Sequence, residues 1–343
     1  MAEVAKIPCP LCGNTSRFLD VRVPSRDDHI KSYGALYEGM SVSEWKICGT
    51  CGFVHQNPRP SAEALDRFYM AGDYHAKVDV DPAVLFAQLA PYYTDEVDYA
   101  IAKSGLRTGT VFDVGCGLGA ALKIFQDRGW SAHGVEPDRG RVAYANERFH
   151  LPNVKHGTLD EKLATDVRAD LVFTHHAFEH FANLDAVMTA ITRILKPNGF
   201  LFTAIPTYRE NRSTMSRLWM NSGHYSLFSD KSFDQLLARY GFEQIDHRYH
   251  PWASGPDQLG HIAKLTGTKP APEQFYEDPD EVYRYLHYVN PLRSAAYLPL
   301  IGGYRGYRHH VKTAAQLVRQ AGRVLFTEPD QFLAKASAYL RRK

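Results

Sequence analysis

A glycine-rich turn between two apolar strands constrains this chain more than any other feature. Residues 111–119 read Val-Phe-Asp-Val-Gly-Cys-Gly-Leu-Gly, and a helical stretch and a second strand ending at Glu136 follow. The glycines Gly115, Gly117 and Gly119 let the backbone turn sharply into a helix N-terminus and pass close to a ligand. A carboxylate at the tip of the next strand can accept hydrogen bonds from both hydroxyls of a ribose. The pattern predicts a site for a nucleoside-containing cofactor.

Two cofactors, S-adenosylmethionine (SAM) and NAD, fit such a turn, because the first two glycines and Ala120 also satisfy the loose dinucleotide-binding pattern. SAM is favoured because Asp113 lies two residues before the first glycine, where a carboxylate can hold the cofactor's ammonium group. Gly119 adds a third alternate glycine, which suits a loop around an amino-acid tail. Residues 194–201, Ile-Leu-Lys-Pro-Asn-Gly-Phe-Leu, indicate a helix end, a turn and a new strand. A glycine turn without a ligand is the remaining alternative.

Over roughly residues 105–265 the chain resembles the class I SAM-dependent methyltransferases, whose fifth strand is commonly introduced by a Leu-Lys-Pro-x-Gly turn. The resemblance implies an α/β fold with a seven-stranded, doubly wound, Rossmann-like sheet that ends in an antiparallel hairpin. The alternating strand and helix patterns agree with such a sheet. The expected strands are 110–114, 131–136, 153–156, 170–174, 199–205, 243–249 and 258–265, and the expected helices are 62–70, 82–103, 119–129, 139–149, 184–196 and 230–240.

Four of the five cysteines form two Cys-x-x-Cys-Gly pairs, Cys9 with Cys12 and Cys48 with Cys51. In such a knuckle two thiolates point to one metal, backbone amides support the sulfurs, and the glycine permits a tight turn. Two knuckles make a closed four-thiolate site, so we predict a structural Zn²⁺ with no open position for chemistry. Disulfides and an iron centre are the alternatives. Cys116, inside the glycine turn, is assigned no reactivity.

The sequence predicts four parts. Residues 1–57 form a zinc-binding module, 58–105 a helical linker or lid, 106–266 the SAM-binding domain, and 267–343 a basic helical extension. The turn-rich stretch 57–61 marks the first boundary, and its serine is expected to cap the next helix. Apolar residues of the extension recur at helical spacing, so we expect it to pack on the core or on a second copy in a homodimer.

Charge is distributed unevenly along the chain. Residues 291–343 carry ten Lys/Arg against two Asp/Glu, a charge of +8, whereas the rest is −6, from 30 basic against 36 acidic residues. A basic segment favours an anionic partner, such as a phosphate-bearing substrate or a membrane surface, although a solvated helical face also explains it. No run approaches the roughly 18 apolar residues of a membrane span, and no apolar signal segment is visible. The expected location is therefore cytoplasmic.

The segment 174–181, Thr-His-His-Ala-Phe-Glu-His-Phe, follows the fourth strand and so lies at the cofactor edge of the sheet. A Glu-His pair at this place resembles methyltransferases that also carry an N-terminal four-cysteine module, among them sugar C-methyltransferases, in which the pair is implicated in proton abstraction. The resemblance implies His180 as a general base accompanied by Glu179. Helix capping or solvent exposure of the pair is the alternative. The backbone of His175 and His176 is expected to line the methionine pocket, and Asp160 is expected to lie near the adenine.

A second cluster, residues 221–229, contains His224 and Tyr225. Similar segments in the relatives lie over the acceptor site, so His224 is expected to contact the acceptor and is the next candidate for the base. Packing in the core is the alternative for Tyr225.

The expected function is transfer of a methyl group from SAM to a sugar, glycan or specialised-metabolite acceptor. O-methylation is favoured over C-methylation, because only about 77 residues follow the sheet, too few for the second domain of the sugar C-methyltransferases. The runner-up is a nucleic-acid methyltransferase that binds through the zinc module and the basic tail. Against it, the chain lacks an Asn/Asp-Pro-Pro-Tyr/Phe motif. A binding-only protein is the third class, and the intact glycine turn argues against it.

Overall fold

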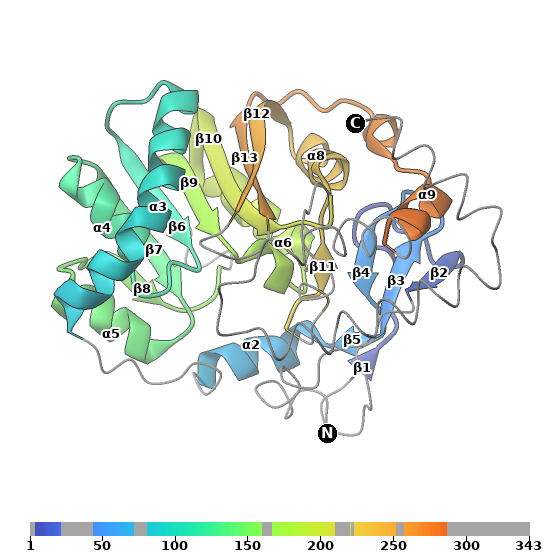
Figure 1. The fold of residues 1–343 in the computed structure, drawn as a ribbon, viewed down its shortest axis with the longest axis horizontal. Coiled ribbons are helices and arrows are strands. Elements are labelled where there is room, and N and C mark those ends of the chain that lie inside the picture. Colours follow the sequence, from blue (N-terminus) through green and yellow to red (C-terminus); the bar gives the residue numbers. More distant parts are fainter. Residues whose placement is uncertain are drawn as a thin grey trace, which may run out of the picture.

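The structure is a computed structural model that describes residues 4–21, 44–71, 81–159, 167–209, 220, 223–251 and 257–286. A large sheet with helices on both faces lies next to a small N-terminal sheet (Figure 1). Some of the sequence predictions fall outside the described residues. These are the adenine contact of Asp160, the residues at helical spacing between 311 and 325, and the basic segment 291–343.

The large sheet has seven strands in the order β12-β13-β10-β9-β6-β7-β8. Strands β10, β9, β6, β7 and β8 run parallel, whereas β13 is antiparallel to both of its neighbours, β10 and β12. The predicted Rossmann-like sheet with its antiparallel hairpin is therefore confirmed. The strands are β6 (Thr110–Val114), β7 (Ser131–Glu136), β8 (Val154–His156), β9 (Ala169–His175), β10 (Leu195–Pro206), β12 (Phe242–Pro251) and β13 (Asp257–Leu265).

The two faces of this sheet bury different sets of apolar side chains, because neighbouring residues of a strand point to opposite faces. Phe173 and Phe202 pack on the face that α3, α4 and α5 cover. Val172 and Leu201 pack on the other face, against α6 and α8. Strands buried on both sides explain the near-continuous apolar runs in the sequence. The helices are α3 (Pro82–Ser104), α4 (Ala120–Asp127), α5 (Arg139–Arg148), α6 (Leu184–Ile194) and α8 (Asp230–Arg239).

Polar caps set several helix starts. Ser61 precedes α2 (Ala62–Ala71) and caps it as predicted: its Oγ accepts from the backbone N–H of Ala64 at 3.2 Å. Asp138 accepts from the N–H groups of the first turn of α5. Several helices are one to three residues shorter than expected; α6, for example, ends at Ile194 because the next residue already pairs in β10.

The small sheet has the strand order β11-β4-β3-β2. Three strands come from the predicted zinc module, but β11 follows the large sheet's β10 in sequence and pairs with β4. Gln56 N–H also donates to the carbonyl oxygen of Tyr225 at 2.9 Å. The module and the segment around His224 therefore share one sheet. The strands are β2 (Phe18–Val21), β3 (Trp45–Cys48), β4 (Val54–Gln56) and β11 (Ser226–Leu227), and a separate pair joins β1 (Val4–Ala5) to β5 (Arg59–Pro60).

The described start of the C-terminal extension packs on this small sheet. It contains η3 (Pro272–Phe275) and α9 (Pro279–Arg284). Val282 and Leu286 are buried in one cluster with Trp45 and Ile47 of β3. This described start of the extension therefore contacts the small sheet of the same chain.

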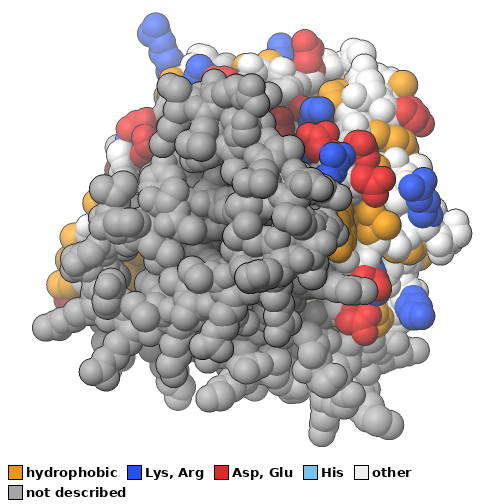
Figure 2. All heavy atoms as spheres, turned by 45° about the vertical axis from the view of Figure 1, so that its right-hand side comes forward, with side chains coloured by type: hydrophobic (Ala, Val, Ile, Leu, Met, Phe, Trp, Pro, Cys, Tyr) orange, Lys and Arg blue, Asp and Glu red, His pale blue; other side chains and the backbone are white. Residues whose placement is uncertain are grey.

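The described surface beside the undescribed residues carries acidic and basic side chains next to each other (Figure 2). Among the described helices, none has both the length and the apolar character needed to cross a bilayer.

Candidate active site and cysteine cluster

The glycine turn has the conformation that its sequence predicts. Gly115, Gly117 and Gly119 have φ values of 75°, 56° and 80°, in the left-handed region that other residues rarely adopt. Glu136 at the end of β7 holds this turn: its Oε2 accepts from Gly117 N–H at 2.8 Å and its Oε1 from Asp138 N–H at 3.0 Å. Glu136 therefore lies at the end of β7, as predicted, and its hydrogen bond to Gly117 also holds the glycine turn in its conformation.

The glycines also serve packing. A Cβ on Gly119 would lie 2.7 Å from Leu151 Cδ1 and 3.2 Å from Ala145 Cβ, so α5 packs directly against this residue. A Cβ on Gly115 would lie 3.1 Å from Ala177 Cβ, after β9. The third glycine thus has a close helix contact that the sequence pattern did not reveal.

Asp113 is the buried carboxyl of this site. It is 2% exposed, and its Oδ1 has no hydrogen-bond partner among the described residues. Burial, and to a lesser extent the neighbouring Glu136, raises the pKa of Asp113 well above its usual range. A buried carboxyl without a partner requires an explanation. A cationic ligand group, such as the ammonium of SAM, fits this position and would favour the ionised form.

Arg141 on α5 is a residue that the sequence analysis missed. Its Nη1 lies 3.3 Å from the Cβ position of Gly117, and its charge lowers the pKa of Glu136, whose overall shift is upward because burial dominates. A cation therefore lies at the glycine turn. In the sequence, only the position of Arg141, five residues after Glu136, indicated that it could lie at this turn.

His175 ends β9 at the same edge of the sheet. Its ring stacks on His176, with centroids 4.4 Å apart, and meets the edge of Tyr93 at 5.1 Å. Burial lowers the pKa of His175 well below its usual range, so the ring is uncharged at neutral pH. Its role in lining the methionine pocket stays a prediction. Tyr93, on α3, was not foreseen because α3 precedes the sheet in sequence.

Glu179 and His180 lie on the short turn η2 (Phe178–His180), directly after β9. His180 donates from Nδ1 to the carbonyl oxygen of Gly223 at 2.6 Å, since a carbonyl can only accept. The neutral ring therefore carries its lone pair on Nε2, which lies 3.8 Å from Glu179 Oε1. The two side chains approach each other although they are adjacent in sequence.

The environment keeps this pair uncharged at neutral pH. Glu179 is 1% exposed, and neither carboxyl oxygen has a hydrogen-bond partner among the described residues. Burial raises the pKa of Glu179 to about 8 and lowers the pKa of His180 to about 4. His180 is thus available as a proton acceptor over the whole neutral range.

His224 joins the pair from the segment before β11. Its ring meets that of His180 at right angles, with centroids 4.8 Å apart. Ligand atoms of Glu179, His180 and His224 all lie within 4.8 Å of one another, so the structure brings the three predicted catalytic side chains together. Two histidines and one carboxylate are also a donor set that divalent metals accept. Tyr69 of α2, whose hydroxyl lies 3.2 Å from His180 Nδ1, was missed.

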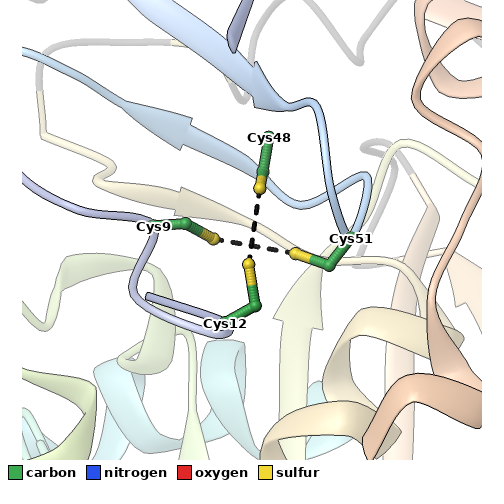
Figure 3. A group of neighbouring side chains, drawn as sticks. All are labelled: Cys9, Cys12, Cys48 and Cys51. Carbon is green, nitrogen blue, oxygen red and sulfur yellow. Dashed lines mark hydrogen bonds between the residues drawn. The ribbon is translucent and has the colours of Figure 1, made fainter. Parts of the chain in front are cut away.

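The four predicted cysteine ligands converge, as Figure 3 shows. The sulfurs of Cys9 and Cys51 are 3.7 Å apart and those of Cys12 and Cys48 are 3.5 Å apart. A tetrahedron with Zn–S bonds of about 2.3 Å places its sulfurs roughly 3.8 Å apart. These distances fit one metal ion, and all five cysteines are free of disulfides.

The two knuckles have the same backbone geometry. Gly13 N–H donates to the carbonyl of Cys9, and Gly52 N–H donates to that of Cys48, both at 2.9 Å. Both glycines have left-handed φ values, 75° and 77°. Thr50 N–H donates to Cys48 Sγ at 3.4 Å, the amide support that the motif predicted. Hydrogen bonds from the neighbouring thiols lower the pKa of Cys48.

Comparison with known proteins agrees with this geometry. Residues 85–247 match the family model described as a methyltransferase domain. The chain is 26% identical over 181 residues to the C-methyltransferase NovU of Streptomyces niveus, covering 49% of this chain and 43% of that protein. It is 29% identical over 154 residues to the ubiquinone biosynthesis O-methyltransferase of Rhodopseudomonas palustris strain HaA2, covering 43% and 52%.

The chain spans about half the length of these two relatives. A solved geranyl diphosphate C-methyltransferase from Streptomyces coelicolor A3(2), with S-adenosyl-L-homocysteine in its complex, superposes with a TM-score of 0.40 at 14% identity, over 50% of this chain and 76% of that one. Residues 85–247 of the chain are thus similar to a methyltransferase domain, and they include the greater part of the seven-stranded sheet expected of one.

Proposed function

We propose that this protein transfers a methyl group from SAM to a hydroxyl oxygen of a sugar, glycan or specialised-metabolite acceptor. One observation carries the proposal: Asp113 and Glu136, which suit a cofactor, and the cluster of Glu179, His180 and His224 lie at the same edge of the large sheet. Ligands of open α/β sheets bind beyond the C-terminal ends of the parallel strands.

Bound SAM supplies an electrophilic methyl group on a sulfonium ion. Asp113 would hold the cationic amino end, and Glu136 would accept from the ribose hydroxyls while it keeps the glycine turn in place. His180 Nε2 would take the proton of the acceptor hydroxyl as the oxygen attacks the methyl carbon and the carbon–sulfur bond breaks. The imidazolium that forms would keep its Nδ1 bond to Gly223, and its charge would be stabilised by Glu179 once that carboxyl is ionised, at a pH near its pKa of about 8.

The relatives support the methyl transfer but leave the acceptor atom open, because their names include both a C-methyltransferase and an O-methyltransferase. An imidazole that is neutral at the working pH can accept the proton of a hydroxyl as it leaves during the attack. The same base would serve carbon methylation only at an acidic carbon beside a carbonyl.

We further propose that Cys9, Cys12, Cys48 and Cys51 bind one structural Zn²⁺. The sulfur separations and the amide support of Cys48 are consistent with this ion. A site closed by four thiolates has no position for substrate, so the metal would stabilise the small sheet.

The proposal is tested by incubating the protein with methyl-labelled SAM and separate pools of nucleotide sugars, glycan fragments, phenolic metabolites and nucleic acids. We expect one added methyl group per product molecule in a hydroxyl-bearing pool, located on oxygen by NMR. His133→Ala is the matched control for His180→Ala, because His133 lies on β7 and its ring contacts Ser131 rather than the cluster. Label in nucleic acid alone would instead support the runner-up.

A further inference from the structure

Glu277 is a buried acidic residue between η3 and α9, beyond residues 85–247, which match the methyltransferase domain. Its side chain is 2% exposed, and donors that follow β10 and precede α8 surround it. Tyr208 donates its hydroxyl to Oε2 at 3.0 Å, Ser229 donates to the same oxygen at 2.5 Å, and Arg209 pairs with Oε1. Since a guanidinium has only donors, Glu277 acts as a carboxylate that accepts all three bonds.

The backbone of Glu277 is fixed to the knuckle of Cys48 and Cys51. Its N–H donates to the carbonyl oxygen of Cys51 at 3.1 Å. A Cβ on Gly52 would lie 2.7 Å from the carbonyl oxygen of Glu277, so a side chain at this place would separate the two segments. The knuckle therefore fixes the position from which the Glu277 carboxylate reaches Ser229.

Ser229 is the last residue of the segment 223–229, which contains β11 and leads into α8. It is the N-cap of α8, and its hydroxyl oxygen also accepts from Ser232 N–H at 3.0 Å. Next to it, the carbonyl oxygen of Phe228 accepts from Thr207 Oγ1 at 2.9 Å. This end of the segment is thus held by the carboxylate of Glu277 and by the residue that follows β10.

The other end of the segment holds the proposed base. Tyr225 N–H donates to the carbonyl oxygen of Glu179 at 2.6 Å, and the carbonyl oxygen of Gly223 accepts from His180 Nδ1 at 2.6 Å. Because a carbonyl can only accept, its position keeps the ring proton of His180 on Nδ1. The hydroxyl of Tyr69, at 3.2 Å from Nδ1, can donate or accept and so favours neither tautomer.

We propose that Glu277 is a positioning residue for methyl transfer. It anchors the segment 223–229 to the knuckle, so that the carbonyl of Gly223 keeps the proton of His180 on Nδ1 and leaves Nε2 to accept the proton of the acceptor. This inference rests on the proposed function, in which His180 is the base. It gives the cysteine knuckle a part in methyl transfer in addition to stabilising the small sheet.

The test uses tautomer-sensitive ¹⁵N NMR of the histidine rings in the full-length protein, which needs no acceptor. Wild-type His180 should carry its proton on Nδ1. Glu277→Ala removes the link between the knuckle and Ser229, so we expect the proton to be shared between Nδ1 and Nε2. Ser229→Ala removes the same link from the other side while Arg209 stays paired with Glu277, and it should give the same result. It decides the matter if Glu277→Ala does not fold.

Two controls separate positioning from a general loss of stability. Tyr208→Phe removes a donor from the same carboxylate oxygen but lies outside the segment 223–229, so it should lower Tm and leave the proton of His180 on Nδ1. Glu273→Ala, exposed on η3, should match wild type in both. In the methyl-transfer assay, Glu277→Ala should lower kcat about fivefold, the worth of one hydrogen bond, while affinity for S-adenosylhomocysteine is unchanged.

Wild-type His180 protonated on Nε2 would overturn the inference, and so would a proton that stays on Nδ1 in both Glu277→Ala and Ser229→Ala. A proton shared in Tyr208→Phe as well would assign the effect to lost stability and would also overturn it. If the NMR results agree but no pool is methylated, the proposed function fails and the hold of Glu277 on His180 stands.

Discussion

His180 and Gly223 are joined by a hydrogen bond of 2.6 Å across 43 residues of sequence, with Nδ1 as donor and the carbonyl oxygen as acceptor. This contact decides which nitrogen of His180 can receive a proton. It also ties His180 to the segment that carries His224 and enters the small sheet as β11.

His180→Ala should reduce turnover by about 10² to 10⁴, the usual contribution of a general base, while SAM affinity stays within a few-fold. Turnover follows from a methyl-transfer assay and affinity from calorimetry. Near-normal turnover in His180→Ala would move the base to His224, the other ring of the cluster.

The pH dependence of kcat/KM should report Glu179 rather than His180. Burial has moved the pKa of His180 to about 4, below the assay range, and that of Glu179 to about 8. An ionised Glu179 stabilises the imidazolium that forms, so the rate should rise with pH toward a plateau above 8. Glu179→Gln should remove this rise. An inflection that persists in Glu179→Gln would assign it to another group.

Glu179 should also make stability depend on pH. Its pKa is raised from the reference value of 4.5 to about 8 in the folded protein, so its stabilising contribution is full below 4.5 and is lost as pH rises through 8. The Tm of Glu179→Gln relative to wild type should therefore increase between pH 5 and 8 and then level off. Thermal melts in a pH series measure this, and a constant difference in Tm would contradict it.

Glu136→Ala should weaken binding of S-adenosylhomocysteine by about 1.5–3 kcal/mol or more, because a charged hydrogen bond to ribose is lost and Gly117 loses its acceptor. NAD should not bind either protein. Calorimetry checks both statements. Unchanged affinity in Glu136→Ala would remove the ribose assignment. Glu147→Ala is the control, because Glu147 lies on α5, the helix that follows β7, but is exposed.

Purified protein should contain about one Zn²⁺ per chain, and Cys48→Ser should lose it and lower Tm by roughly 10 °C, as expected when a structural metal is lost. Elemental analysis and thermal melts measure the two effects. Four sulfurs in disulfides without metal would contradict the zinc site. A second metal ion per chain that is lost in His180→Ala would instead indicate a cation at Glu179, His180 and His224 and would exclude His180 as the base.

The sequence alone determined the features that depend on neighbours along the chain. The glycine turn, the knuckles at Cys9 and Cys48, the acid at Glu136 and the alternation of strands and helices follow from conformational preferences within a few residues. These local patterns, together with the resemblance to the class I methyltransferases, were enough to predict the seven-stranded sheet and the convergence of four cysteines.

Only the tertiary structure decided which distant groups meet. Tyr69 reaches His180 across 111 residues, and Glu96 reaches Gln258 across 162. Strand β11 adds to the small sheet although it follows β10 in sequence, because a strand edge offers unpaired backbone groups to any segment that the fold brings near. Burial, which is a property of the packed molecule, then moved the pKa values of Glu179 and His180 in opposite directions.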